Sequence, residues 1–212
     1  TYGFHKEANY QICNTKYEIN YTKFDLKIKN VGSKKIHIQN ILLNLIGKHN
    51  VLNAAAAISL SLNLGLKENV IKKALKNFTG VQRRWTKVFK KNKVEFYDDY
   101  AHHPTEIKSV LEGVRIVATK RKIISVFQPH RYSRIRSLKL EFAKCFTDSD
   151  QVMLCPVYPA GEVTDKTYNE NKFAQLIKKF SKTQVIIITD ENDLKNYFSK
   201  NLIKDEIVIG MG

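Results

Sequence analysis

A short polar stretch, DDYAHHPTE at residues 98–106, contains the residue types in this chain that are best able to do chemistry. It sets Asp98, Asp99, His102 and His103 in front of a proline. Carboxylates and imidazoles can bind a metal, an aspartate at such a turn can accept hydrogen bonds from ribose hydroxyls, and the same groups can simply satisfy a turn and cap a helix. Adjacent histidines on a strand-to-helix turn tend to point in different directions, and no further ligand group is evident. The stretch therefore favours a ligand-contacting turn over a metal site, with a purely structural turn as the remaining alternative.

Two more polar clusters follow apolar runs later in the chain, QPHRYSR at residues 128–134 and PVYPAGE at residues 156–162. Ligands of open α/β sheets bind at the carboxyl ends of the strands, so three such clusters indicate one shared pocket. Arg131 and Arg134 are three residues apart, and two converging guanidinium groups suit a carboxylate or a phosphate. They predict a small anionic or zwitterionic substrate. Two surface arginines and an RNA contact are the alternatives.

Another motif, GKHNVLNA at residues 47–54, resembles the end of a Walker A loop without being one. The spacing G-x-x-x-x-G-K-[ST] fails, because His49 stands where Ser or Thr is needed and Leu42 where the first Gly is needed. His49, Asn50 and Asn53 are polar residues at the start of an otherwise apolar helical stretch. A cap explains one of them. The set of three predicts that this helix start faces a ligand.

The elements that must position these motifs divide the chain near residue 85. Before it, the sequence predicts strands within 10–46, with a turn at NVGSKK and a separate apolar run at IQNILLNLIG, then a buried helix ending at Gly65 and a helix with apolar spacing from 70 to 78. After it, strand-like runs alternate with helical patterns five times. This alternation is typical of an α/β fold with a parallel sheet covered on both faces. The expected strands of this part are VEFYDD, KIISVF, QVMLCPV, QVIIIT and EIVIG.

Helical patterns fall between these strands. His103 can cap a helix that has Pro104 at its first position and Glu106 in its first turn, which suits the N-terminal end of the helix dipole. The later helices are indicated by apolar residues on one face. These are Leu138, Phe142, Cys145 and Phe146 for one helix and Phe173, Leu176, Ile177 and Phe180 for the next, with a last helix at 191–200.

Charge and cysteine content narrow the function classes. The net charge of +16 raises the expectation of a nucleic-acid partner, but the basic residues form short clusters and no basic run reaches five. We therefore expect a lysine-rich solvated surface and no nucleic-acid binding. No apolar run approaches the roughly eighteen residues of a membrane span, and the N-terminus has no signal-peptide pattern. Three cysteines without a C-x-x-C pair predict reduced thiols in a cytoplasmic protein.

Five motifs together, GKHNVLNAAAAI, FTGVQRRW, DDYAHHPTEI, FQPHRYSR and VYPAGE, resemble the Mur ligases in order and spacing. The resemblance covers essentially the whole chain. Within the family it is greatest to the ligases that join L-alanine to UDP-N-acetylmuramate, and the ligases that recycle a tripeptide are the alternative. It implies a three-domain cytoplasmic enzyme of peptidoglycan synthesis. ATP and Mg²⁺ convert the muramate carboxylate to an acyl phosphate, which the L-alanine amine attacks.

The resemblance also implies which parts of such an enzyme are present. Residues 1–85 correspond to the later part of an α/β ATP-binding central domain, and residues 86–212 to the C-terminal Rossmann-like domain, truncated at its end. The P-loop, the Mg²⁺ ligands and the UDP-sugar domain would lie upstream. The chain is therefore expected to be an inactive fragment with no metal ligands of its own. A non-catalytic interaction domain and a basic RNA-binding module are the alternatives from other classes.

Roles in nucleotide binding are implied for residues on both sides of the domain boundary. Asn50 and Asn53 would contact adenine, with His49 beside them. Arg84 would reach the ATP phosphates, and Asp99 would hold the ribose.

A second set of residues would bind the amino acid. Tyr100, His102, Arg131 and Arg134 are implied to line the L-alanine pocket. The arginine pair suits the alanine carboxylate, which leaves the amine free to attack. No residue of the chain is assigned as catalytic.

Overall fold

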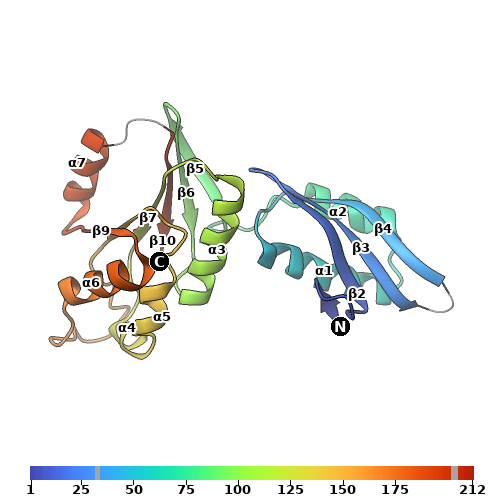
Figure 1. Cartoon of the computed structure of the whole chain (residues 1–212), viewed down its shortest axis with the longest axis horizontal. Coiled ribbons are helices and arrows are strands. Elements are labelled where there is room, and N and C mark those ends of the chain that lie inside the picture. Colours follow the sequence, from blue (N-terminus) through green and yellow to red (C-terminus); the bar gives the residue numbers. More distant parts are fainter. Residues whose placement is uncertain (32–33, 202–204) are drawn as a thin grey trace. The chain divides into compact units, whose positions relative to one another are not determined.

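The computed structural model describes residues 1–31, 34–201 and 205–212, and it consists of two compact units, Thr1–Gly80 and Val81–Gly212 (Figure 1). The division lies before the boundary expected near residue 85, because the intervening turn is bonded to the second unit. The backbone N–H of Tyr100 donates to the carbonyl of Arg83 at 2.7 Å, and that of Trp85 donates to the Asp99 carboxylate at 2.8 Å. No helix formed by the described residues is long and apolar enough to cross a membrane.

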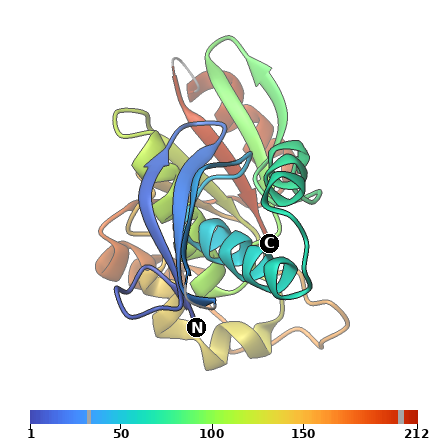
Figure 2. The ribbon, with the colours of Figure 1, turned by 90° about the vertical axis from the view of Figure 1, so that its right-hand side faces the viewer.

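Unit 1 is a four-stranded sheet with its two helices against one face (Figure 2). The strands run in the order β1-β2-β3-β4, and the long pairs are antiparallel. Alternate residues of β3, among them Phe24 and Leu26, are fully buried and form the core together with Val51 and Ala55 of α1. The elements are β1 (Tyr2–Gly3), β2 (Tyr10–Tyr17), β3 (Thr22–Val31), β4 (Lys34–Leu43), α1 (Lys48–Asn63) and α2 (Glu68–Asn77).

Two expectations for unit 1 are corrected. The run IQNILLNLIG does not form a strand of its own, because most of it continues β4 across a bulge beside Asn40. Helix α1 ends close to Gly65 as expected but is buried along one side only, and Leu60 and Leu64 are 63% and 70% exposed. The turn expected at NVGSKK lies partly at residues 32–33, outside the described residues.

Unit 2 is built on a six-stranded sheet in the order β5-β6-β10-β7-β8-β9. All neighbouring strands are parallel except the edge strand β5, which is antiparallel to β6. The α/β fold expected from the alternating patterns is confirmed. The elements are β5 (Thr86–Lys91), β6 (Val94–Asp99), α3 (Pro104–Val117), β7 (Ile123–Phe127), α4 (Tyr132–Ser137), α5 (Lys139–Lys144), β8 (Gln151–Leu154), α6 (Glu170–Ser181), β9 (Gln184–Ile187), α7 (Glu191–Asn201) and β10 (Ile207–Met211).

Alternate residues of each central strand pack against helices on opposite faces of this sheet. On one face the ring of Phe127 lies 5.6 Å from that of Phe142 and 5.2 Å from that of Phe146. On the other, Ile124 belongs to an apolar cluster against which Leu194 of α7 packs. Burial on both faces explains why the strands are continuous apolar runs.

Two features of unit 2 differ from the expectation, and the strand order is a third feature on which the sequence made no prediction. Strand β5 was not predicted, because its side chains are largely exposed and lysine-rich, as edge strands often are. The helix expected around Leu138 is two short helices, since Leu138 itself leaves the helical region at φ −118° and ψ 29°. The last strand, β10, is inserted between β6 and β7.

Candidate functional site

The turn after β6 is organised by a helix cap at the start of α3. The Nδ1 atom of His103 accepts a hydrogen bond from the backbone N–H of Thr105 at 3.3 Å. A carboxylate oxygen of Glu106 accepts from the N–H groups of His102 and His103 at 3.1 and 3.2 Å. The expected cap is confirmed, and the arrangement is a capping box. His103 thus has a structural role, whereas the His102 ring takes no part in the cap.

His102 is oriented by the main chain beside it. Its Nδ1 lies 2.8 Å from the carbonyl oxygen of Tyr100. A carbonyl oxygen can only accept, so Nδ1 carries a proton. The rings of Tyr100 and His102 lie 4.8 Å apart. The two side chains therefore form one surface at the end of β6.

The Asp99 side chain is almost fully buried, and both of its oxygens accept hydrogen bonds from the main chain. Its two oxygens accept from the backbone N–H groups of Trp85 and Ala101 at 2.8 and 2.9 Å, and the residue is only 2% exposed. Burial raises the pKa of the Asp99 carboxyl, although these two hydrogen bonds act to lower it. In this structure Asp99 fastens the turn that carries Arg84 and presents almost no surface to a ligand. Its role toward ribose stays a prediction.

Arg83 is a residue that the sequence did not single out. Its guanidinium lies over the ring of Tyr100, 4.6 Å from the centroid. It also donates to the carbonyl of Gly212 at 3.0 Å and pairs with Asp98 at 3.3 Å. Arg83 thus links the turn before β5 to the ends of β6 and β10. The signal for Arg83 in the sequence is the doubled arginine of VQRRW, which points to Arg83 as well as to Arg84.

The second and third polar clusters are joined by main-chain hydrogen bonds. The N–H of Arg131 donates to the carbonyl of Tyr158 at 2.9 Å, and the N–H of Tyr158 donates to the carbonyl of Pro129 at 2.8 Å. Arg131 has a left-handed backbone conformation, with φ 71°. Glu162 accepts from the N–H of Ser133 at 3.1 Å. The loop after β8 therefore holds the arginine turn after β7 in place.

The polar cluster after β6 (residues 98–106) also lies near the cluster after β7 (residues 128–134), although β10 separates the two strands. The ring of His130 lies 6.1 Å from that of His102 and 5.3 Å from that of Tyr158. Gly212, the residue after β10, packs closely on the chain that follows β7. A Cβ on Gly212 would lie 2.4 Å from the carbonyl oxygen of Gln128.

The charged groups at these strand ends suit an anion. Arg134 Nη1 lies 3.4 Å from His130 Nδ1. Burial, and then the charges of Arg134 and Arg131, lower the pKa of His130 below its ordinary value. A neutral His130 can accept a hydrogen bond, and the guanidinium groups can hold a carboxylate. Of the four residues predicted for this pocket, the structure brings Tyr100 and His102 together and links them to Arg134 through His130, which the sequence reasoning passed over.

The predicted nucleotide residues of unit 1 lie in the first turns of α1. Asn50 is half-buried and its side-chain amide donates to the carbonyl of Ile46 at 2.8 Å, while Asn53 is exposed. The expectation that one of these residues caps the helix is wrong. The N-cap is Gly47, with φ 93° and no side-chain cap. His49 is half-buried beside them.

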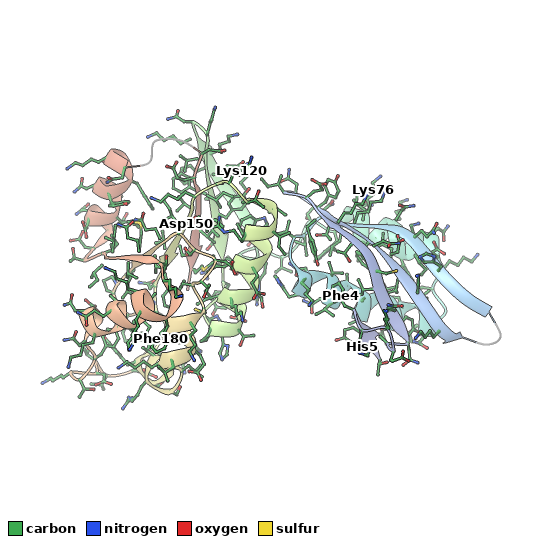
Figure 3. The ribbon with its side chains drawn as sticks, viewed as in Figure 1. Phe4, His5, Lys76, Lys120, Asp150 and Phe180 are labelled. Carbon is green, nitrogen blue, oxygen red and sulfur yellow. The ribbon has the colours of Figure 1, made fainter. Side chains whose placement is uncertain are left out.

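Basic side chains are spread over both units, and Figure 3 shows nitrogen-tipped side chains projecting from each of them. Some of these charges are paired. Asp150, labelled in Figure 3, accepts from Arg115 at 2.7 Å. The three cysteines are free thiols.

Comparison with known proteins identifies the family of this chain. Residues 83–212 match the family described as Mur ligase, glutamate ligase domain, which is more than half of the chain. The chain belongs to the Mur ligase family. This confirms the resemblance to the Mur ligases seen in the sequence.

Other Mur ligases align with the whole chain. The UDP-N-acetylmuramate–L-alanine ligase of Pelagibacter ubique (strain HTCC1062) is 44% identical over 212 residues, which are 100% of this chain and 46% of the relative. The solved structure of the UDP-N-acetylmuramate–alanine ligase of Thermotoga maritima has a TM-score of 0.78 at 27% identity, covering 100% of this chain and 44% of that one. A murein peptide ligase of Psychrobacter arcticus, at 18% identity and TM-score 0.63, shares the fold over 100% of this chain and 42% of that one. This Mur ligase chain thus spans about half the length of the curated relatives it matches.

Proposed function

We propose that this chain is part of an ATP-dependent ligase that joins L-alanine to UDP-N-acetylmuramate in the cytoplasm. Residues 1–85 would be the later part of its ATP-binding central domain and residues 86–212 its C-terminal domain. Two kinds of observation support this proposal. First, relatives that align with the whole chain are named UDP-N-acetylmuramate–L-alanine ligase. Second, His102, His130 and Arg134 lie near one another at the strand ends of unit 2. The second is the observation that carries the proposal for this chain.

The strand-end residues suit an amino acid that must be held by its carboxylate. Arg131 and Arg134 would bind the carboxylate of L-alanine, because guanidinium groups match carboxylate oxygens in shape and charge. The amine is then left to attack the carbonyl carbon of the muramoyl phosphate, so that a C–N bond forms, the C–O bond to phosphate breaks and inorganic phosphate leaves. His102 Nε2 would accept a hydrogen bond from the amine, and His130 Nδ1, which lies 3.4 Å from Arg134 Nη1, would orient that guanidinium. These residues would act by positioning and charge neutralisation.

Nucleotide contacts are proposed for each unit separately. In unit 1, Asn50 and Asn53 would contact adenine beside His49. In unit 2, the half-exposed guanidinium of Arg84 suits a phosphate. Asp99 would reach the ribose only after the turn that it now holds has moved.

Mg²⁺ would be held by residues outside this chain. Within the part of the chain that the structure describes, no group of three or more His, Cys, Asp or Glu ligand atoms lies at the strand ends of unit 2. ATP and Mg²⁺ would supply the activated carboxylate, and the residues of this chain would position the acceptor.

A chimaera tests the proposal. The matching segment of the Pelagibacter ubique ligase is replaced by this chain, and phosphate release is measured with ATP and UDP-N-acetylmuramate, with and without L-alanine. We expect L-alanine-dependent release from the chimaera and none from the 212-residue chain alone. A folded chimaera that accepts a tripeptide but not L-alanine would favour the recycling ligase. One that is inactive with both would contradict the proposal.

A further inference from the structure

Three potential metal ligands meet on the sheet of unit 1, and none of them belongs to the proposed nucleotide or amino-acid sites. Cys13 on β2, Asp25 on β3 and His37 on β4 have ligand atoms that all lie within 4.8 Å of one another. The Asp25 carboxylate lies 3.5 Å from His37 Nε2. Among the described residues, this is the one group of three or more such side chains. We propose that Cys13, Asp25 and His37 bind a divalent transition-metal ion of the Zn²⁺ class.

Strand pairing explains why residues so far apart in sequence converge. Cys13 lies directly opposite Asp25 in the antiparallel register. Asp25 falls between two core residues of β3, so its side chain faces the side of the sheet away from the core. His37 lies opposite Lys27, two residues further along the same face, which makes His37 a diagonal neighbour of Asp25. Three hydrogen-bonded strands thus hold the three ligands near one another before any ion binds.

Two β-bulges flank Asp25 and are bonded to it. The register shifts on β2 beside Asn14 and on β4 beside Asn40, and both asparagines have positive φ, 51° and 57°. The Asn14 side-chain amide donates to one Asp25 oxygen at 2.7 Å, and the Asn40 backbone N–H donates to the other at 2.8 Å. Bulges re-aim side chains, and carboxylates that bind metals are usually oriented by such outer hydrogen bonds. The Asp25 carboxylate is therefore already fixed as a metal-binding carboxylate would be.

The donor set selects the class of ion. A thiolate, an imidazole and a carboxylate make three ligands of a tetrahedral site, with the fourth position left to water. The sulfur ligand favours Zn²⁺ or Co²⁺ over Mg²⁺, which prefers oxygen. Ligand atoms around a tetrahedral Zn²⁺ are roughly 3.5 Å apart given its usual bond lengths. The side chains must therefore close by about 1 Å, and the exposed ring of His37 can rotate to do so.

Two local features oppose binding and set its pH dependence. Burial raises the pKa of the Cys13 thiol, whereas the nearby ammonium of Lys27 lowers it. Lys27 also repels a cation, but it is exposed, and its flexible stem can carry the charge into water. The ion must displace the thiol proton, so binding strengthens as the pH rises. By strand alternation and register, Lys16, Lys23, Lys27 and Lys29 share this face with Cys13, Asp25 and His37.

Cobalt titration of the whole 212-residue chain under reducing conditions tests the site. We expect one equivalent of Co²⁺ to produce a thiolate-to-cobalt charge-transfer band and tetrahedral d–d bands, which Zn²⁺ then abolishes. Cys13→Ser should remove the charge-transfer band, and His37→Gln should weaken binding at least about tenfold through loss of one ligand. Both variants keep the hydrogen bonds of Asp25 to the bulges, so the fold is retained. Asp25→Asn is less informative because it also disturbs the bulges.

Matched controls lie elsewhere in the chain. Cys155→Ser removes a half-buried thiol of unit 2, and His5→Gln removes a histidine of unit 1 outside the group. Both should leave the spectrum unchanged. No thiolate band with the unaltered chain, a band that survives Cys13→Ser, or an affinity that His37→Gln does not change would each overturn the proposal. None of these readouts depends on ligase activity.

Discussion

The Asp99 carboxylate accepts a hydrogen bond from the backbone N–H of Trp85, fourteen residues earlier, at 2.8 Å. A second link runs beside it, from the N–H of Tyr100 to the carbonyl of Arg83 at 2.7 Å. Together they bind the turn that carries Arg83 and Arg84 to the end of β6. The position of both guanidinium groups therefore depends on a buried carboxylate.

Asp99→Ala should destabilise the chain substantially. It leaves the N–H groups of Trp85 and Ala101 buried without their acceptor, and an unsatisfied buried donor costs about 1–3 kcal/mol. We expect the free energy of unfolding, measured with urea, to fall by about 2 kcal/mol or more on that basis. Asp98→Ala is the matched control, because Asp98 makes only a partly exposed pair with Arg83 and should cost about 0–1 kcal/mol. Equal losses in the two variants would contradict this account of Asp99.

Glu106→Ala should loosen the turn that carries His102. The variant removes the acceptor for the N–H groups of His102 and His103, and loss of a helix cap costs about 1 kcal/mol. We expect faster hydrogen exchange of these two amides, measured by NMR. Glu112→Ala, on the same helix, removes only an exposed pair with Lys108 and should leave their exchange unchanged. Exchange that stays slow in Glu106→Ala would show that the turn is held by other contacts.

Glu95 should make stability depend on pH. Burial raises the pKa of its carboxyl, but hydrogen bonds and charges from Lys87 and Arg121 outweigh burial and lower it below the ordinary value. Because the pKa is lower in the folded state, the carboxylate adds stability above its unfolded pKa of about 4.3. That stability is lost as the pH falls through the folded pKa.

The comparison that isolates this effect is Glu95→Gln against the unaltered chain, in urea unfolding from pH 7 to pH 3. We expect a difference of about 1.5–3 kcal/mol at pH 7, as for a charge-assisted hydrogen bond. The difference should shrink as the pH falls below about 4.3. Glu191→Gln, which breaks an exposed pair with Lys195, should differ little at any pH. A difference that stays constant with pH would exclude ionisation of Glu95 as its cause.

Arg131→Ala in the chimaeric ligase should raise the KM for L-alanine. If Arg131 binds the substrate carboxylate, its loss removes a charge-assisted hydrogen bond, and about 1.5–3 kcal/mol corresponds to roughly 10–150-fold. Arg136→Ala is the control, because Arg136 lies on α4, the helix that Arg131 precedes, and its side chain is 71% exposed beside Asp165. Its KM should match that of the unaltered chimaera. An unchanged KM in Arg131→Ala would remove this residue from the pocket.

Where the sequence predicted well, the interactions are local. His103, Pro104 and Glu106 are close neighbours in the chain, and their capping box follows from the residue types themselves. The buried strands were visible because strands covered on both faces are continuous apolar runs. Strand β5 was missed because an exposed edge strand has no such pattern.

The sequence by itself therefore determined the α/β class, the helix cap beside His102 and the motifs that identify the family. Only the tertiary structure decided that β10 lies between β6 and β7, that His130 bridges His102 and Arg134, and that Cys13 meets Asp25 and His37. The physical reason is that main-chain hydrogen bonds between strands are much the same for every residue type. An apolar run shows that a strand is buried but not which strand lies beside it, and the side chains that meet at the strand ends depend on that pairing.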